Sequence, residues 1–307
     1  MPLVVGIFTH VIWQVYLNRT FHQQFAGSFW QWLPSYFVGL DKFGGNFSWF
    51  GNHLWYLEWL FLFSVICLPL LIWLRRGSGK RVLAWLDGLL SSRWGIYLPS
   101  LVMMLFLFIL NPDASLLTSD DFGGWSFPNY LFFFLIGFVF ASSEIVLANI
   151  RRMRWVSLAA GILTTLVGGA LYAILGNQEF GTPLYLLLNT LAAATGWCWI
   201  LAIFGLGLER LNFRTPFLDY ANEAVLPFYI LHQTILLTMG YFVVTMPVVD
   251  FAKWAIIAST SFIGIMVIYE FLVRRNNVMR FLFGMKPLPR PKDRVIEPMA
   301  AGQVKLG

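Results

Sequence analysis

Runs of about twenty apolar residues recur along this chain, and they restrict its fold more than any other feature. Two of them cover residues 54–74 and 224–246. A helix needs roughly 20 apolar residues to cross ~30 Å of hydrocarbon. Charged residues make up only 12% of the chain, against roughly 25% in soluble domains, and so few charges cannot cover a water-facing surface. The runs therefore predict an integral membrane protein.

The predicted fold is all-α, a polytopic bundle of about eight transmembrane helices. Residues 1–285 form the membrane domain, and residues 286–307, rich in prolines and charges, form a disordered cytoplasmic tail. The predicted spans are residues 2–17, 54–74, 96–110, 130–149, 156–175, 184–208, 224–246 and 252–273.

The distribution of positive charge predicts the orientation, because Lys and Arg accumulate in cytoplasmic loops. Of the 21 basic residues, all but Arg19, Lys42 and Lys253 follow the second, fourth or sixth span or lie near the C-terminus. We therefore expect a protein of the cytoplasmic (inner) membrane with both termini in the cytoplasm. Residues 82–94 form an amphipathic stretch after the second span, which predicts a helix lying along the cytoplasmic interface.

Several partners and cofactors are excluded by composition. The basic residues sit in short loops and form no continuous patch, so the net charge of +6 indicates contact with membrane lipids and no binding of nucleic acid. The two cysteines, Cys67 and Cys198, both fall within apolar spans, which excludes a disulfide framework and a zinc site of CxxC type. We expect no metal and no bound cofactor.

Ionisable residues within spans are functional candidates, because burying them in lipid costs free energy. His53 and Glu58 lie at the outer end of the second span. His232 lies about 12 Å and Glu144 about 8 Å from the cytoplasmic ends of their spans, so the two can share a layer and pair. The structural alternatives are an interfacial cap for His53 and a helix-to-helix hydrogen bond for His232. His10 has no charged neighbour in its span.

Three segments carry a resemblance to a known family. Residues 219–233, DYANEAVLPFYILHQ, resemble the ninth-helix region of the acyltransferase 3 family, especially the branch with the glucan biosynthesis protein that succinylates periplasmic glucans. Residues 45–57 resemble the start of that branch's fourth helix, and residues 134–152 resemble its sixth helix. The resemblance covers nearly all of the chain.

The resemblance implies a membrane-bound O-acyltransferase. Such proteins have ten helices with both termini inside, and they move an acyl group, here of acetyl or succinyl type, from cytosolic acyl-CoA to an extracytoplasmic carbohydrate such as a periplasmic glucan. The spans of this chain would be helices three to ten. The family's first helix carries a basic residue and a histidine about ten positions later, which is thought to act as the base, and no such pattern precedes Leu17. We therefore expect the first two family helices to be missing, and we leave the family's base unassigned.

Three groups of residues are candidates for acyl transfer, which needs a base, an acceptor site and a route for the thioester. Acyl-CoA would be a co-substrate. The candidates for proton transfer are His232, Glu144 and Tyr229. The candidates for acceptor binding are His53, Trp55, Glu58 and Trp49. The candidates for holding the CoA phosphates are Arg75, Arg76, Arg151 and Arg152, whose alternative role is to set the topology.

Two other classes of function remain open. A transporter or flippase of a lipid or sugar conjugate would also need buried His and Glu side chains along a cavity, although its usual inverted repeats are not visible here. An inactive, truncated relative of the acyltransferases is the third interpretation. The acyl group, the acceptor and the oligomeric state are not specified by the sequence.

Overall fold

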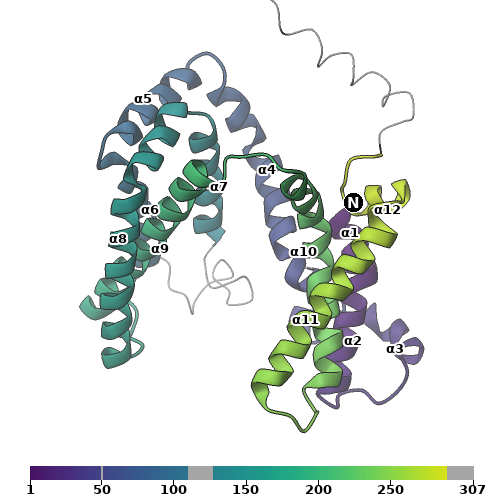
Figure 1. Cartoon of the computed structure of the whole chain (residues 1–307). Helices are drawn as coiled ribbons and strands as arrows, with labels where there is room; N and C mark the ends of the chain where they lie inside the picture. The colour runs from purple at the N-terminus through teal and green to yellow at the C-terminus, as the bar shows by residue number, and fades with distance from the viewer. Residues whose placement is uncertain (50, 110–126, 289–307) are drawn as a thin grey trace, which may run out of the picture. The chain divides into compact units, whose positions relative to one another are not determined.

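The computed structural model describes residues 1–49, 51–109 and 127–288, and these residues are helical, with one isolated bridge between Leu40 and Phe47 and no strand (Figure 1). The chain divides into two compact units. The first contains Met1–Glu58 and Arg214–Gly307, and the second contains Trp59–Phe213. The prediction of an all-α fold is confirmed for the described residues.

Five of the described helices are long and apolar enough to cross a membrane. They are Asn52–Leu74, Glu144–Leu175, Pro183–Arg210, Pro216–Val243 and Asp250–Val273. The first contains the 3-10 turn η3 (Asn52–Leu54) and α4 (Trp55–Leu74), and the next three are α8, α9 and α10. The last consists of α11 (Asp250–Ile268) and the π-helical turn η6 (Tyr269–Val273). The chain is therefore a helical protein of membrane type, but a count of eight spans is not confirmed.

Two other predicted spans are helical but differ from the long type. The first predicted span forms one continuous helix made of α1 (Pro2–Gly6), the π-helical turn η1 (Ile7–Val11) and α2 (Ile12–Phe21), and it is not among the five. The third corresponds to η4 (Gly95–Tyr97) and α6 (Pro99–Ile109). This segment is bent by 109° from α5 (Gly79–Ser91), so the amphipathic stretch predicted over residues 82–94 is a separate helix.

The predicted fourth span, residues 130–149, is wrong in its second half. α7 (Phe127–Ala141) is a short apolar helix, and α8 begins at Glu144. The break arises because Ser143 has extended backbone and its hydroxyl accepts a hydrogen bond from the amide of Val146 at 3.3 Å, which caps α8. Because α8 continues to Leu175, the predicted fifth span is its C-terminal part. The basic residues of this region lie inside α8: Arg151, Arg152 and Arg154.

The first unit is built around α10, which packs against α2 and α11. Its core includes Trp32 and Tyr36 from α3 (Phe29–Tyr36). A short helix near the chain end, α12 (Asn277–Leu282), was not predicted. An ion pair fastens α12 to α10, with Arg280 only 4% exposed and its Nη2 atom 2.5 Å from a carboxylate oxygen of Glu223.

The second unit is held together chiefly by α8 and α9, which pack along their lengths. Their backbones come close at Gly205, where an added Cβ would lie 2.7 Å from the carbonyl oxygen of Ile150. The buried indole of Trp197 in α9 donates a hydrogen bond to the carbonyl of Ile96 at 2.8 Å. Tight helix packing of this kind is common where small residues let backbones approach.

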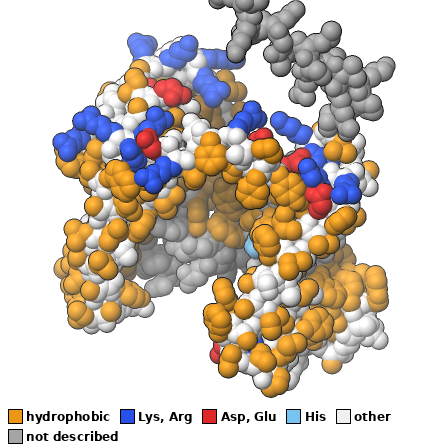
Figure 2. All heavy atoms as spheres, viewed as in Figure 1, with side chains coloured by type: hydrophobic (Ala, Val, Ile, Leu, Met, Phe, Trp, Pro, Cys, Tyr) orange, Lys and Arg blue, Asp and Glu red, His pale blue; other side chains and the backbone are white. Residues whose placement is uncertain are grey.

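Hydrophobic side chains cover most of the visible surface of each unit, and most Lys and Arg side chains gather at one end of each unit taken by itself (Figure 2). Large apolar side chains such as Ile203 and Leu166 are about two-thirds exposed, at 65% and 66%. A surface of this kind is stable in lipid and not in water. It agrees with the membrane character of the five long helices.

Candidate functional site

Two histidines that are far apart in the sequence meet in the first unit. His53 lies in η3, just before α4, and His232 lies in α10. Their ring centroids are 5.2 Å apart and the rings are nearly perpendicular, at 86°. The chain enters η3 through Gly51 and Asn52, which both have positive φ, at 66° and 48°. Glycine tolerates this conformation and asparagine does so better than most residues, so this pair can turn His53 toward α10.

Both ring nitrogens of His53 are used by the protein. Its Nε2 lies 3.2 Å from the carbonyl oxygen of Ile230, and since a carbonyl can only accept, Nε2 carries the hydrogen. Its Nδ1 lies 3.3 Å from Nε2 of Gln14, which donates to it. His53 is therefore held as one neutral tautomer, with no lone pair left for a substrate proton.

Gln14 connects the histidine to two further polar side chains. It is 1% exposed, its Nε2 also donates to Oγ1 of Thr234 at 2.6 Å, and its Oε1 accepts from Nδ2 of Asn52 at 3.4 Å. The hydroxyl of Ser48 donates to Asn52 in turn, at 2.5 Å. A buried amide with its hydrogen bonds made fixes the relative position of its neighbours. Sequence reasoning missed Gln14 and Thr234, and the only signal was a single amide within an apolar run.

His232 is arranged differently, with one nitrogen held and the other open. Its Nδ1 lies 2.6 Å from the carbonyl oxygen of Tyr229, so Nδ1 carries the hydrogen and Nε2 keeps its lone pair. No group among the described parts of the chain hydrogen-bonds this Nε2. The ring stacks parallel to that of Phe228, with centroids 6.3 Å apart. A partly exposed imidazole with a fixed tautomer can accept a proton from a bound hydroxyl group.

The helix around His232 begins earlier than predicted. α10 starts at Pro216, where Thr215 accepts a hydrogen bond from the amide of Leu218 at 3.2 Å, and not at residue 224. His232 therefore lies about 24 Å from the start of the helix, near its middle. Pro227 is buried inside α10 and removes one backbone donor a turn before His232.

Tyr229 has a structural task in this arrangement. Its hydroxyl donates a hydrogen bond to the backbone carbonyl of His53. Its ring centroid lies 5.9 Å from that of His53 and 5.6 Å from that of His232. The predicted proton-transfer residue Tyr229 therefore joins η3 to α10, and its hydroxyl hydrogen is already engaged.

The predicted location of Glu144 is wrong. It does not lie inside the predicted fourth span but is exposed in the first turn of α8, where a carboxylate is favoured by the helix dipole. Glu144 belongs to the second unit and His232 to the first. Their pairing stays a prediction.

The four residues predicted to bind the acceptor do not form one cluster with His232. Trp49 is exposed on the loop before Gly51, and the ring of Trp55, at the start of α4, lies 6.2 Å from that of Tyr56. The Oε2 atom of Glu58 is buried without a hydrogen-bond partner in the described part of the chain. Of the four, the structure brings only His53 to His232.

The predicted CoA-binding arginines all belong to the second unit. Arg75 and Arg76 are exposed beyond α4, and the guanidinium of Arg75 lies 5.2 Å from the ring centroid of Phe138. Arg75 and Lys80 line a cavity of about 470 Å³ that also includes Asp87. The charged lining of this cavity is therefore two basic side chains and one acidic side chain.

The second arginine pair is partly engaged. Arg151 lies 3.7 Å from Glu209 of α9, which Arg154 also approaches, at 3.6 Å. Arg152 is exposed. Within the described ranges, no three His, Cys, Asp or Glu side chains are grouped to hold a metal ion. Compared with known proteins, the chain matches no family model, no curated protein and no solved structure.

Proposed function

We propose that this chain is a membrane-bound O-acyltransferase in which His232 is the base. The observation that carries the proposal is the lone pair on Nε2 of His232, near the middle of α10, with the opposite nitrogen fixed by the carbonyl of Tyr229. The resemblance of residues 219–233 to acyltransferase 3 proteins supports it, because that segment contains His232. On this proposal the protein lies in the inner membrane with both termini in the cytoplasm.

The chemistry would proceed in one displacement with balanced protons. A hydroxyl of an extracytoplasmic carbohydrate, such as a periplasmic glucan, gives its proton to Nε2 of His232 as its oxygen attacks the thioester carbonyl of acetyl- or succinyl-CoA. The new C–O bond forms, the C–S bond breaks, and the departing thiolate takes up the proton to give free CoA. A base at hydrogen-bond distance contributes roughly 10²–10⁴-fold to such a step.

The other residues would position the reactants. The fixed, neutral ring of His53 forms a wall beside His232. In the second unit, taken by itself, Arg75 and Lys80 would bind phosphate oxygens of CoA at the cavity that they line together with Asp87. Trp49 and Trp55 offer aromatic rings to the apolar faces of a sugar.

The test is acyl transfer from radiolabelled acetyl- or succinyl-CoA into envelope carbohydrate by membranes that contain the full chain. We expect His232→Ala to lower the rate about 100-fold or more, because the base is removed. The matched control is His10→Gln, since His10 faces Phe283, with ring centroids 6.0 Å apart. Equal rates for the His232 variant and wild type would refute the role of His232. An absence of label from folded wild-type protein would contradict acyl transfer and leave the two other interpretations, transport of a lipid or sugar conjugate and an inactive, truncated relative.

A further inference from the structure

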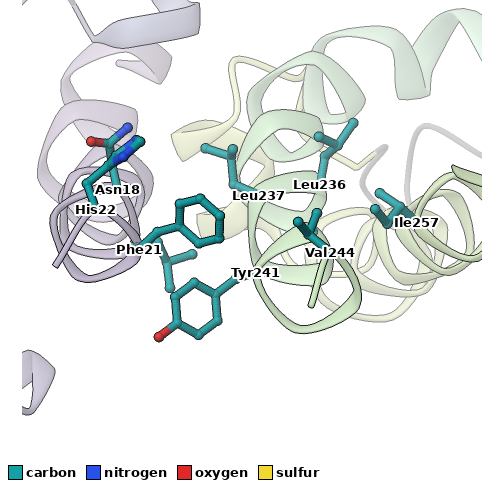
Figure 3. A pocket seen from close by; sticks show the side chains of 10 residues that line it. Asn18, Phe21, His22, Leu236, Leu237, Tyr241, Val244 and Ile257 are labelled. Carbon is teal, nitrogen blue, oxygen red and sulfur yellow. The ribbon is translucent and has the colours of Figure 1, made fainter. Parts of the chain in front are cut away.

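A groove lies between α2, α10 and α11 in the first unit, and its lining does not include His53 or His232 (Figure 3). Its volume is about 350 Å³, and its walls include Leu17 and Phe21 of α2, Leu237 and Tyr241 of α10, and Ile257 of α11. The rings of Phe21 and Tyr241 lie 6.2 Å apart, edge to face. The groove is therefore at the end of the unit where α2 and α10 both finish.

The groove is a feature of the packing that small side chains keep open. Gly240 of α10 lines it, and a Cβ added there meets no atom within 4 Å. Within the same stretch of α10, Thr238 accepts a hydrogen bond at its Oγ1 from Nε1 of Trp13 at 2.9 Å, which fixes α2 against α10. The groove extends about 12 Å along α10, from Leu236 to Val244.

The lining is mostly apolar, and the α2 side carries polar side chains (Figure 3). The deep end is apolar, with Leu17 and Leu237. Asn18 and His22 add polar groups on the α2 side, and His22 stands at the C-terminal end of that helix. Among the described residues that line the groove, none is Lys, Arg, Asp or Glu. An apolar groove with uncharged polar groups on one side suits an amphiphile whose apolar chain lies in the groove and whose polar group lies beside Asn18 and His22.

We propose that this groove binds a single acyl chain of a membrane phospholipid, with the lipid headgroup beside Asn18 and His22. α10 and α11 are long and apolar enough to cross a membrane, so lipid chains surround the groove. A protein helix is about 10–12 Å wide, and 350 Å³ would hold less than one turn of it. Part of an acyl chain fits this volume and length, and each buried methylene adds to its affinity.

The first test is retention of phosphatidylethanolamine by the purified full chain, counted by native mass spectrometry after detergent washing. Gly240→Leu places a side chain in open space inside the groove, and we expect it to weaken retention of one lipid roughly tenfold or more. The matched control is Gly169→Leu in α8, where an added Cβ also meets nothing within 4 Å. This control should retain the lipid like wild type. Equal retention by all three proteins would overturn the proposal.

The second test uses the unmodified chain and does not depend on how a variant folds. The chain is placed in vesicles that contain phosphatidylethanolamine with a diazirine in one acyl chain, irradiated and mapped by peptide mass spectrometry. We expect label on Leu237 and Tyr241 to exceed label on Ile203, which is 65% exposed on α9. Even labelling would show that the groove holds no lipid in preference to the open surface. Crosslinks between two chains through Tyr241 would show instead that a second copy covers it.

Discussion

Replacing Gln14 with leucine tests whether one amide holds the histidine site together. Leucine is close to glutamine in volume, so the main change is the loss of the hydrogen bonds to His53, Thr234 and Asn52. Hydrogen bonds between membrane helices average about 0.6 kcal/mol, so losing these three should lower the free energy of unfolding by about 2 kcal/mol. The loss rises to about 4 kcal/mol if Nδ1 of His53 finds no other donor.

The assay is reversible unfolding of the purified protein in mixed micelles with increasing dodecyl sulfate. A loss of about 2 kcal/mol lowers the folding equilibrium constant roughly 30-fold. Gln233→Leu is the matched control, because Gln233 also lies in an apolar helix but is not part of the Gln14 hydrogen bonds. The free energy of unfolding of Gln233→Leu should fall by less than about 0.5 kcal/mol.

A double-mutant cycle separates the hydrogen bonds from other effects. If Gln14 and Thr234 act as a pair, the double variant should lose less stability than the sum of the losses of Gln14→Leu and Thr234→Val, by about 0.5 kcal/mol or more. Full additivity, or a Gln14→Leu protein as stable as wild type, would refute the reasoning.

Three further perturbations are expected to have measurable effects. Glu223→Gln removes the counter-charge of buried Arg280 and should lower the free energy of unfolding by about 2–3 kcal/mol. Glu270→Gln, whose partners Arg274 and Arg275 have side chains 40% and 61% exposed, should lower it by less than about 1 kcal/mol, and equal effects of the two variants would contradict this. Gly205→Ala should cost about 1–3 kcal/mol because its Cβ would lie 2.7 Å from the carbonyl of Ile150, whereas Gly207→Ala, in open space, should cost nothing in the same unfolding assay. Burial raises the pKa of Tyr36 to about 12, so the stability that its neutral form provides is full below pH 10 and declines as the pH rises from 10 to 12. Tyr36→Phe should lack this decline. If the variant lost stability at alkaline pH just as wild type does, the role of Tyr36 would be contradicted.

The helices that the sequence predicts best are those whose signal is local. The predicted ends of α9, α10 and α11 lie within a few residues of the observed ones. The exception is the start of α10, which Thr215 caps earlier than predicted. The fourth span was misread because a single serine, Ser143, ends one helix and caps the next inside an apolar stretch. Hydropathy averaged over a window of about 19 residues cannot reveal a helix break that depends on one residue.

The candidate site was predicted in part. His53 and His232 were both singled out because ionisable side chains in spans are costly, but their contact depends on two segments far apart in the chain. Tautomers, the open Nε2 of His232 and the role of Gln14 follow only from the hydrogen bonds. The proposed pairing of His232 with Glu144 had assumed equal depths in two spans, and Glu144 proved to begin a helix.

The π-helical turn Ile7–Val11 has a consequence for the helix that carries Gln14. A π-helical turn accommodates one extra residue in an α-helix, and one residue corresponds to a rotation of about 100°. The residues before and after the turn therefore belong to two different angular phases of the same helix. Deleting one residue, such as Thr9, would realign the phases and rotate Gln14 away from Thr234, although every apolar residue would be kept. The insertion acts as a phase shift in the helix, and it allows a largely apolar helix to direct the amide of Gln14 at α10.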